Sequence, residues 1–332
     1  MTTYNNPGGW TGLASLAHTI GAGLAVITYL LAALLLVGNT VRWIAHTNAA
    51  AADFRHPVKG AMHATLPGGL LVAAVMTSVV SPSLFSAVVA TWIIAILVSV
   101  GGALALVMGI AFAVTLITGQ PSGESVNGGW FIPPVVTIII PMALSPLVSR
   151  VDASVAGLLI VASYAFYGMG FLLFLVTLGL VYDRLVLHPL PPAPLAPTVW
   201  IGLGPIGVAA LVPMTLAKAG TNLWADVAPA VNLMTRLAST AVWGFGLWWL
   251  ALAVVLLVRY VRKGGVPFHL GWWAFVFPLG AYTAATITLA RSWQSPALEA
   301  VSVVLYLGLL AAWLVVGVRT LAGIRSGRIW SS

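Results

Sequence analysis

The sequence predicts an all-α integral membrane protein built from quasi-repeated helical hairpins. First, 61% of its 332 residues are apolar and only 6% are charged, whereas a soluble domain carries about 25% charged residues. Second, residues 61–123 and 237–258 contain no charged side chain, and both stretches exceed the roughly 20 residues of a spanning helix. Third, the apolar runs lack the alternation of barrel strands.

The predicted spans are the apolar runs between turn signals. Nine are clear, at approximately residues 15–42, 58–80, 84–118, 130–149, 154–183, 197–217, 232–259, 267–290 and 295–321. No soluble domain fits between them. We therefore expect a single transmembrane domain over residues 1–332.

Four of these spans carry a proline beside small or apolar residues, in "TLPGGLL", "FIPPVVT", "GLGPIGV" and "FVFPLGA". Pro67, Pro133, Pro205 and Pro278 are 66, 72 and 73 residues apart, and a longer, smoother span follows each. The repeat unit is thus a hairpin of one broken and one smooth helix. The hairpins cover approximately residues 1–46, 56–118, 129–184, 197–260 and 267–322. The first is predicted from Pro7, Gly8 and Gly9, with half of its broken helix missing or very short.

A proline in a membrane helix removes a backbone donor and frees carbonyls, which hydrocarbon does not tolerate unless protein or a water-filled cavity satisfies them. Broken helices in register therefore predict a common interior, with the smooth helices outside. The alternative is that prolines are simply common in membrane helices and kink them without function.

The basic residues predict the orientation. Ten of the fourteen Lys and Arg residues fall on one side of the predicted spans, which favours a cytoplasmic C-terminus in a plasma (inner) membrane. The net charge of +8 reflects this loop bias, and no basic run with interleaved aromatics indicates a nucleic-acid partner. The absence of cysteine excludes disulfides and thiol chemistry.

Three pieces of the chain, "DFRHP" (53–57), "GGWFIPPV" (128–135) and "GWWAFVFPLGAYTAAT" (271–286), resemble the tellurite-resistance/dicarboxylate transporter family, which includes the plant slow-type anion channels. The resemblance implies five hairpins around a central pore of kinked helices, usually in a homotrimer. It also implies transport of small inorganic or carboxylate anions and a pore-blocking phenylalanine at Phe277. The family has ten membrane helices, whereas this sequence has nine clear spans.

Phe277, directly before Pro278, is the candidate gate, because an aromatic ring across a narrow pore excludes water. As a bare sequence feature, an aromatic residue in a membrane helix is more often a packing residue, and the resemblance favours the gate. Phe275, two residues earlier, points to a different face and serves as a control.

The candidate pore lining combines the prolines with hydroxyls that could donate to an anion. Each threonine could equally bond back to a carbonyl one turn earlier. The residues are Pro67, Thr65, Pro133, Thr137, Pro205, Thr215, Pro278, Gly280, Thr283 and Thr286. His56 is a candidate pH sensor at a helix start.

Cofactor and enzyme functions are disfavoured. No pair of the six histidines has the three- or four-residue spacing of a compact metal or haem site, so we expect no cofactor. The six acidic residues offer no paired carboxylates, and Glu299 at a helix start is explained by the helix dipole, so we expect no enzyme.

Two functions stay open. One is a channel that passes chloride or nitrate without coupling, and the other is a proton-coupled carrier of C4-dicarboxylates, sulfite or tellurite. A dicarboxylate carrier is expected to hold its substrate with a buried Arg or Lys, and no broken helix has one at mid-depth, which favours the channel.

Overall fold

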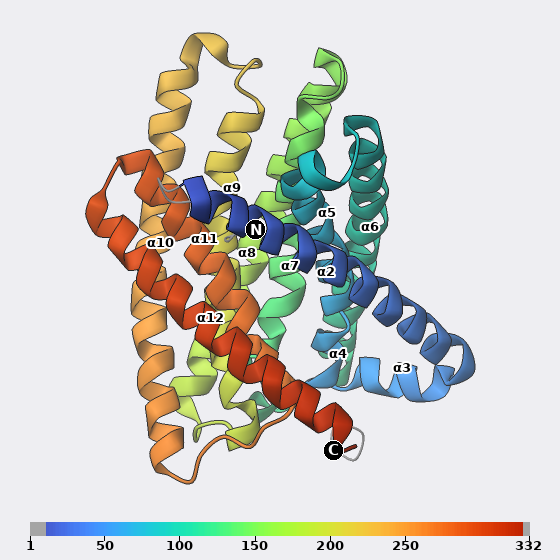
Figure 1. Ribbon diagram of the computed structural model, residues 1–332. Helices are drawn as coiled ribbons and strands as arrows, with labels where there is room; N and C mark the ends of the chain where they lie inside the picture. Colours follow the sequence, from blue (N-terminus) through green and yellow to red (C-terminus); the bar gives the residue numbers. More distant parts are fainter. Residues whose placement is uncertain (1–10, 328–332) are drawn as a thin grey trace. The chain divides into compact units, whose positions relative to one another are not determined.

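The computed structural model describes residues 11–327, and in that range its regular secondary structure is entirely helical (Figure 1). Nine of the described helical segments are long and apolar enough to cross a membrane. The all-α prediction and the nine predicted spans are therefore confirmed. The predicted helix half around Pro7, Gly8 and Gly9 lies outside the described residues.

The described chain divides into two compact units. Unit 1 consists of the described residues up to Pro121, Ile132–Gly170 and Thr215–Ala228, and unit 2 consists of Ser122–Phe131, Phe171–Met214 and the described residues from Pro229 on. The five predicted hairpins, and the single transmembrane domain that they are expected to form, stay predictions.

The helices have the following bounds. Unit 1 holds α2 (Thr11–Ala45), α3 (Thr47–Arg55), α4 (Lys59–Met62), α5 (Thr65–Leu84), α6 (Ala87–Gly119), α7 (Ile132–Val148) and the 3-10 turn η4 (Ala225–Val227). Unit 2 holds η1 (Gly123–Ser125), η2 (Gly128–Phe131), η3 (Ala193–Gly202), η5 (Leu270–Phe275), α11 (Val276–Trp293), α12 (Pro296–Arg325) and all but the first residue of α10 (Ala228–Arg262). Two helices contribute to both units, α8 (Ala153–Leu187) and α9 (Leu203–Ala219).

The repeated prolines stand in the first turn of α5, α7, α9 and α11. A short helical piece precedes each of them, namely α4, η2, η3 and η5. Because the first four N–H groups of a helix have no intrahelical partner, a proline there loses no hydrogen bond. The spans are thus broken as predicted, but each proline opens the second piece instead of kinking the middle of a helix.

Burial separates the broken spans from the smooth ones. In their most apolar windows 56% to 83% of the broken spans is buried, against 11% to 28% of the smooth spans. Within unit 1 α5 packs against α6, and within unit 2 α11 packs against α12 as a hairpin (Figure 1). The smooth helices therefore expose the larger apolar surface.

Two boundaries differ from the prediction. Helix α5 runs to Leu84 and includes Pro82 in its last turn, whereas the sequence predicted an end near residue 80. The polar linker after α2 forms the short helix α3, which ends at Arg55 and was not predicted. Its alanine-rich sequence, "TNAAAADFR", favours a helix. The segment is too polar to be detected as an apolar span, so hydropathy alone does not predict it.

Candidate functional site

Helices α9 and α11 approach each other at backbone distance within unit 2. A Cβ atom on Gly207 would lie 2.5 Å from the amide nitrogen of Tyr282 and 2.6 Å from the carbonyl carbon of Ala281. Only glycine fits such an approach, as is common where membrane helices pack closely. Gly207 therefore fixes the spacing of the two helices.

Phe277 lies one helical turn away on the same side of α11, and its ring covers Gly204. The ring atoms Cε1 and Cδ1 are 3.3 and 3.7 Å from the position that a Cβ of Gly204 would take. The residue is nevertheless 40% exposed. Its ring thus rests on the backbone of α9 and leaves one side uncovered.

Phe275 has the opposite environment, since only 9% of it is exposed. Its ring makes edge-to-face contacts with Trp200 and Trp272, at centroid distances of 5.3 and 5.8 Å. Phe275 and Phe277 therefore differ in burial, and that they point to different faces of the helix stays a prediction.

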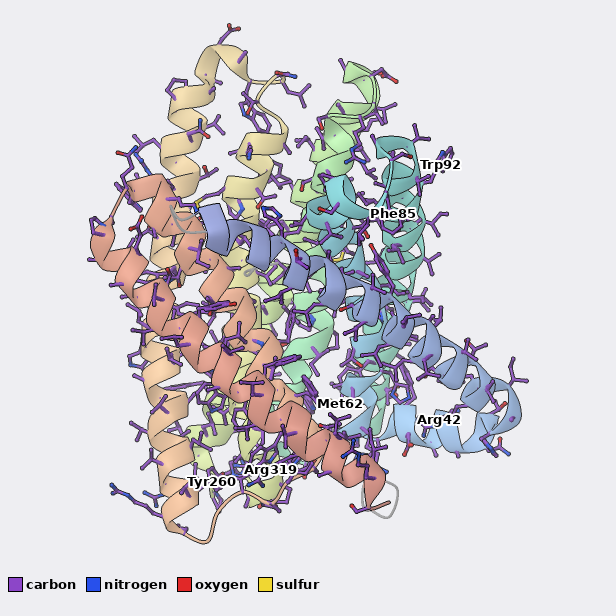
Figure 2. The ribbon with its side chains drawn as sticks, viewed as in Figure 1. Arg42, Met62, Phe85, Trp92, Tyr260 and Arg319 are labelled. Atoms are coloured by element: carbon purple, nitrogen blue, oxygen red, sulfur yellow. The ribbon has the colours of Figure 1, made fainter. Side chains whose placement is uncertain are left out.

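The 3-10 piece η5, which leads into Phe277, is anchored at both ends. His269 donates from Nε2 to the carbonyl of Pro194 at 2.7 Å, and its Nδ1 accepts the amide of Gly271 at 3.0 Å. On the other side Trp273 donates to the Thr320 hydroxyl at 3.2 Å, and the Arg319 guanidinium lies 5.0 Å from the Trp272 ring centroid. Figure 2 labels Arg319 on α12.

The threonines of α11 bond to their own helix. Thr283 donates to the carbonyl of Leu279 at 2.7 Å, and Thr286 donates to the carbonyl of Tyr282 at 2.8 Å. Thr286 also accepts the indole N–H of Trp243 at 2.9 Å, and both threonines are fully buried. Donation to an anion would require each hydroxyl to exchange its carbonyl partner, so a pore-lining role stays a prediction for both.

The remaining predicted lining residues range from buried to exposed, and two of their threonines also donate to their own helix or the turn before it. Thr137 donates to the carbonyl of Pro133 at 3.1 Å and is buried, whereas Thr65 donates to the carbonyl of Met62 at 2.6 Å and is exposed. Thr215 and Gly280 are half-buried, and the four prolines Pro67, Pro133, Pro205 and Pro278 are buried. Of the predicted lining residues in α11, Gly280 is half-buried and the others are buried.

His56 is exposed and ends α3. Its Nδ1 accepts the amide of Val58 at 3.1 Å and lies 3.4 Å from the amide of Lys59. The imidazole therefore holds the turn between α3 and α4, and the pH-sensing role of His56 stays a prediction.

The contact of α9 with α11 beside Phe277 is uncharged, because residues 203–214 and 276–290 contain no charged side chain, and Lys218 and Arg291 lie in the last turns of the two helices. At the start of these helices, positive potential comes from the helix N-termini and their free amides. Among the described residues, no group of three histidine, aspartate or glutamate side chains is placed to hold a metal ion. The surface suits weak contact with a partly dehydrated ion.

Sequence reasoning quoted "GLGPIGV" for its proline and missed its glycines. Gly204 and Gly207 are three residues apart, which puts them on one helix face, and this spacing is the signal that could have indicated a helix contact.

The structural role of Arg184 was also not predicted from the sequence. This residue is only 4% exposed, and it donates from Nε to the carbonyl of Glu124 at 3.2 Å and from Nη1 to that of Pro189 at 2.5 Å.

Broken and smooth spanning helices, with an uncharged contact surface on the broken ones, define a multi-pass membrane protein of the transport class. The chain belongs to the voltage-dependent anion channel family, whose model matches residues 8–321. It is accordingly a transporter or channel for anions, and the resemblance drawn from its motifs is confirmed.

Individual relatives agree with this family. An uncharacterized transporter of Methanocaldococcus jannaschii is 31% identical over 94% of this chain and 86% of its own length. A second transporter of that organism is 30% identical over 87% of this chain and 81% of its own length. A sulfite efflux pump of Trichophyton rubrum is 26% identical over 58% of this chain and 52% of its own length.

Proposed function

We propose that the protein is an anion channel that passes small anions such as chloride and nitrate through a pore within each subunit, which Phe277 occludes at rest. The observation that carries this proposal is the half-exposed ring of Phe277 over Gly204, where residues 203–214 and 276–290 of the two helices carry no charge. A large aromatic side chain in a membrane helix normally packs on its neighbours. This one keeps a free side where glycine on α9 leaves it room to move.

The physical basis of occlusion is dewetting. An aromatic ring in a narrow apolar passage makes water, and therefore a hydrated ion, unfavourable there. Conduction also needs binding weak enough to release the ion. Helix N-termini supply weak positive potential without a fixed charge, so selectivity would follow ease of dehydration.

The sequence of the broken helices favours a channel over a dicarboxylate carrier. Residues 65–84, 132–148, 203–214 and 276–290 contain no Arg or Lys. A carrier that holds two carboxylates is expected to place a cation where the substrate rests. C4-dicarboxylates are therefore the weaker candidates, whereas this argument does not weigh against tellurite.

Sulfite is the second candidate, because a relative is named as a sulfite efflux pump. Sulfite is small enough for the same passage, and proton coupling would make the protein a secondary transporter. Assembly as a homotrimer, placement in the plasma (inner) membrane with a cytoplasmic C-terminus, and lining of the pore by Thr65, Thr137, Thr215, Thr283 and Thr286 belong to the same proposal.

The test is anion flux in proteoliposomes under an imposed voltage, with chloride, nitrate, sulfite and malate compared. Phe277→Ala should raise uncoupled monovalent current sharply. Phe245→Ala, on α10, is the matched control, since Phe245 is exposed to a similar extent but lies outside the broken helices. Phe275→Leu keeps most of the core volume and should leave the current unchanged.

Two results would overturn the proposal. If Phe277→Ala opens no current while sulfite or malate moves only with a proton gradient, the protein is a coupled carrier. If Phe245→Ala raises the current as much as Phe277→Ala does, the increase reports general loosening of the fold and not a gate.

A further inference from the structure

Unit 1 contains a crevice of about 460 Å³ between α2 and the segment from α4 to α5. One face of α2 forms its first wall, through Ala32, Leu35, Asn39 and Arg42, at the spacing of three and four residues that puts side chains on one side of a helix. Figure 2 labels Arg42 on this wall and Met62 on the opposite one.

The two ends of the crevice differ in chemistry. Leu35, Leu66 and Leu70 line the end toward the middle of the helices, whereas Arg42, Lys59 and Asp53 line the other end. Ala32 and Arg42 are separated by about 15 Å along a helix at 1.5 Å per residue. The crevice is therefore a long apolar slot with a charged mouth.

The mouth carries one net positive charge. Asp53 accepts hydrogen bonds from Lys59 Nζ, at 3.1 Å, and from the guanidinium of Arg42. The bond from Lys59, and then the bond from Arg42, lower the pKa of the Asp53 carboxyl, so it is ionised at neutral pH. The side chains of Arg42 and Lys59 stay 42% and 63% exposed, which leaves donors free for a second anion.

A polar atom without a partner lies at the same end. His63 borders the crevice, and its Nδ1 is 3.3 Å from the carbonyl of Lys59, so this nitrogen donates. The other nitrogen, Nε2, is buried and has no hydrogen-bond partner. A neutral ring then presents an acceptor that would suit a hydroxyl donor.

The mouth also lies at the end of an apolar span. Arg42 is in the last turn of α2, whose preceding turns expose leucine and valine. Next to it Trp43, Phe54 and His63 form an edge-to-face aromatic cluster, with centroids 5.3 to 6.5 Å apart. Tryptophan beside a basic residue at a span end is typical of the membrane–water interface.

We propose that this crevice binds an anionic glycerophospholipid. Its phosphate lies between Arg42 and Lys59, and one acyl chain follows Leu35 and Leu70. This site goes beyond anion transport and does not depend on it. The occupant would support α2, of whose most apolar window only 11% is buried.

The test measures the thermal midpoint of the full chain, purified and delipidated in detergent, while phosphatidylglycerol, phosphatidylcholine or inorganic phosphate is added. Phosphatidylglycerol should raise the midpoint because a ligand that binds only the folded state stabilises it. Phosphatidylcholine should raise it less. Inorganic phosphate should neither raise it nor compete.

Three variants separate the built crevice from general attraction. Lys59→Gln keeps the Arg42–Asp53 pair and should weaken phosphatidylglycerol binding by about fivefold. Arg262→Gln, in the exposed basic end of α10, should leave binding unchanged. Gly69→Leu should abolish binding, because its side chain enters the apolar slot, and folding should survive since no atom lies within 4 Å of a Cβ there.

Either of two results would overturn the proposal. Equal protection by inorganic phosphate, with Gly69→Leu unaffected, would mean that the mouth is a free-anion site. Equal loss in Lys59→Gln and Arg262→Gln would mean that anionic lipid is attracted by surface charge without a specific crevice.

Discussion

The ring of Phe277 rests on Gly204, with Cε1 3.3 Å from the position of a Cβ at that glycine. A methyl group there would touch the ring closely without touching backbone first, because Pro278 Cα is 3.7 Å away. The size of the side chain at residue 204 therefore limits how closely the ring of Phe277 can approach α9.

Gly204→Ala tests this relationship without altering the phenylalanine. The added methyl should displace the ring by a few tenths of an ångström, and if Phe277 is the gate, the resting anion current should change several-fold. Folding should be retained, since alanine favours a helix over glycine by about 0.5–1 kcal/mol. The measurement is current in proteoliposomes, with Gly244→Ala as control because nothing lies within 4 Å of its Cβ.

An unchanged current in Gly204→Ala, together with an increased current in Phe277→Ala, would show that the ring gates from a different position. The double variant Gly204→Ala/Phe277→Ala extends the comparison. Its current should equal that of Phe277→Ala alone, because the methyl acts only through the ring.

Gly207→Ala should destabilise unit 2, since the methyl meets the backbone of α11 at 2.5 Å and no side chain can move aside. Overpacking of this kind costs about 1–3 kcal/mol, and a rigid backbone places it at the upper end. Gly280→Ala is the matched control, because its Cβ would meet only Leu309 at 3.7 Å, an ordinary contact. Thermal unfolding in detergent should show a lowered midpoint for Gly207→Ala alone.

Arg184 should stabilise the fold through its hydrogen bonds and should take no part in the anion path. It bridges the carbonyls of Glu124 and Pro189, and hydrogen bonds to a charged group contribute about 1.5–3 kcal/mol. Arg184→Gln should therefore lower the unfolding free energy by roughly that amount. Arg184→Lys should recover only part of it, because an ammonium lacks the planar fork that serves two acceptors.

Flux per folded molecule distinguishes the two roles of Arg184. We expect it to be unchanged in both variants once the amount of folded protein is equal. A shift in the chloride-to-nitrate preference without a loss of stability would contradict the stabilising role of Arg184. It would instead place the guanidinium in contact with the ion.

The breaks of the helices could be predicted from the sequence because a proline favours the first turn of a helix and disfavours helical geometry in the residue before it, and both are local properties, as at Pro133 and Pro205. The contact of Phe277 with Gly204 could not, because it depends on how two helices are rotated and shifted against each other. Those quantities are set by the close approach at Gly207, which hydropathy does not encode.

The charged mouth in unit 1 shows the same limit. The motif "DFRHP" resembles a family motif, but only the structure explains its aspartate. Asp53 forms ion pairs with Arg42 and Lys59. These partners are eleven and six residues away, across the end of α2 and the turn at His56. No helical periodicity brings them together, so the cluster could not be found from spacing.

The acid response of the charged mouth in unit 1 should come from Asp53. Hydrogen bonds from Lys59 and Arg42 lower the pKa of Asp53, so its stabilising contribution is present above its ordinary pKa of 3.8 and is lost only as the pH falls through the lower folded value. Protonation of the carboxyl would then leave Arg42 and Lys59 without the anion that they share.

We therefore expect the contribution of Asp53 to be the same at pH 8 and pH 5 and to be lost only below its ordinary pKa of 3.8. Asp53→Asn should remove this acid-dependent loss, because an amide does not titrate. The variant should also be less stable than the native chain at neutral pH, because a neutral amide binds Arg42 and Lys59 more weakly than a carboxylate does. Thermal unfolding of the full chain in detergent across this pH range is the measurement, and an equal loss of stability at low pH in the native chain and in Asp53→Asn would assign the response to other groups.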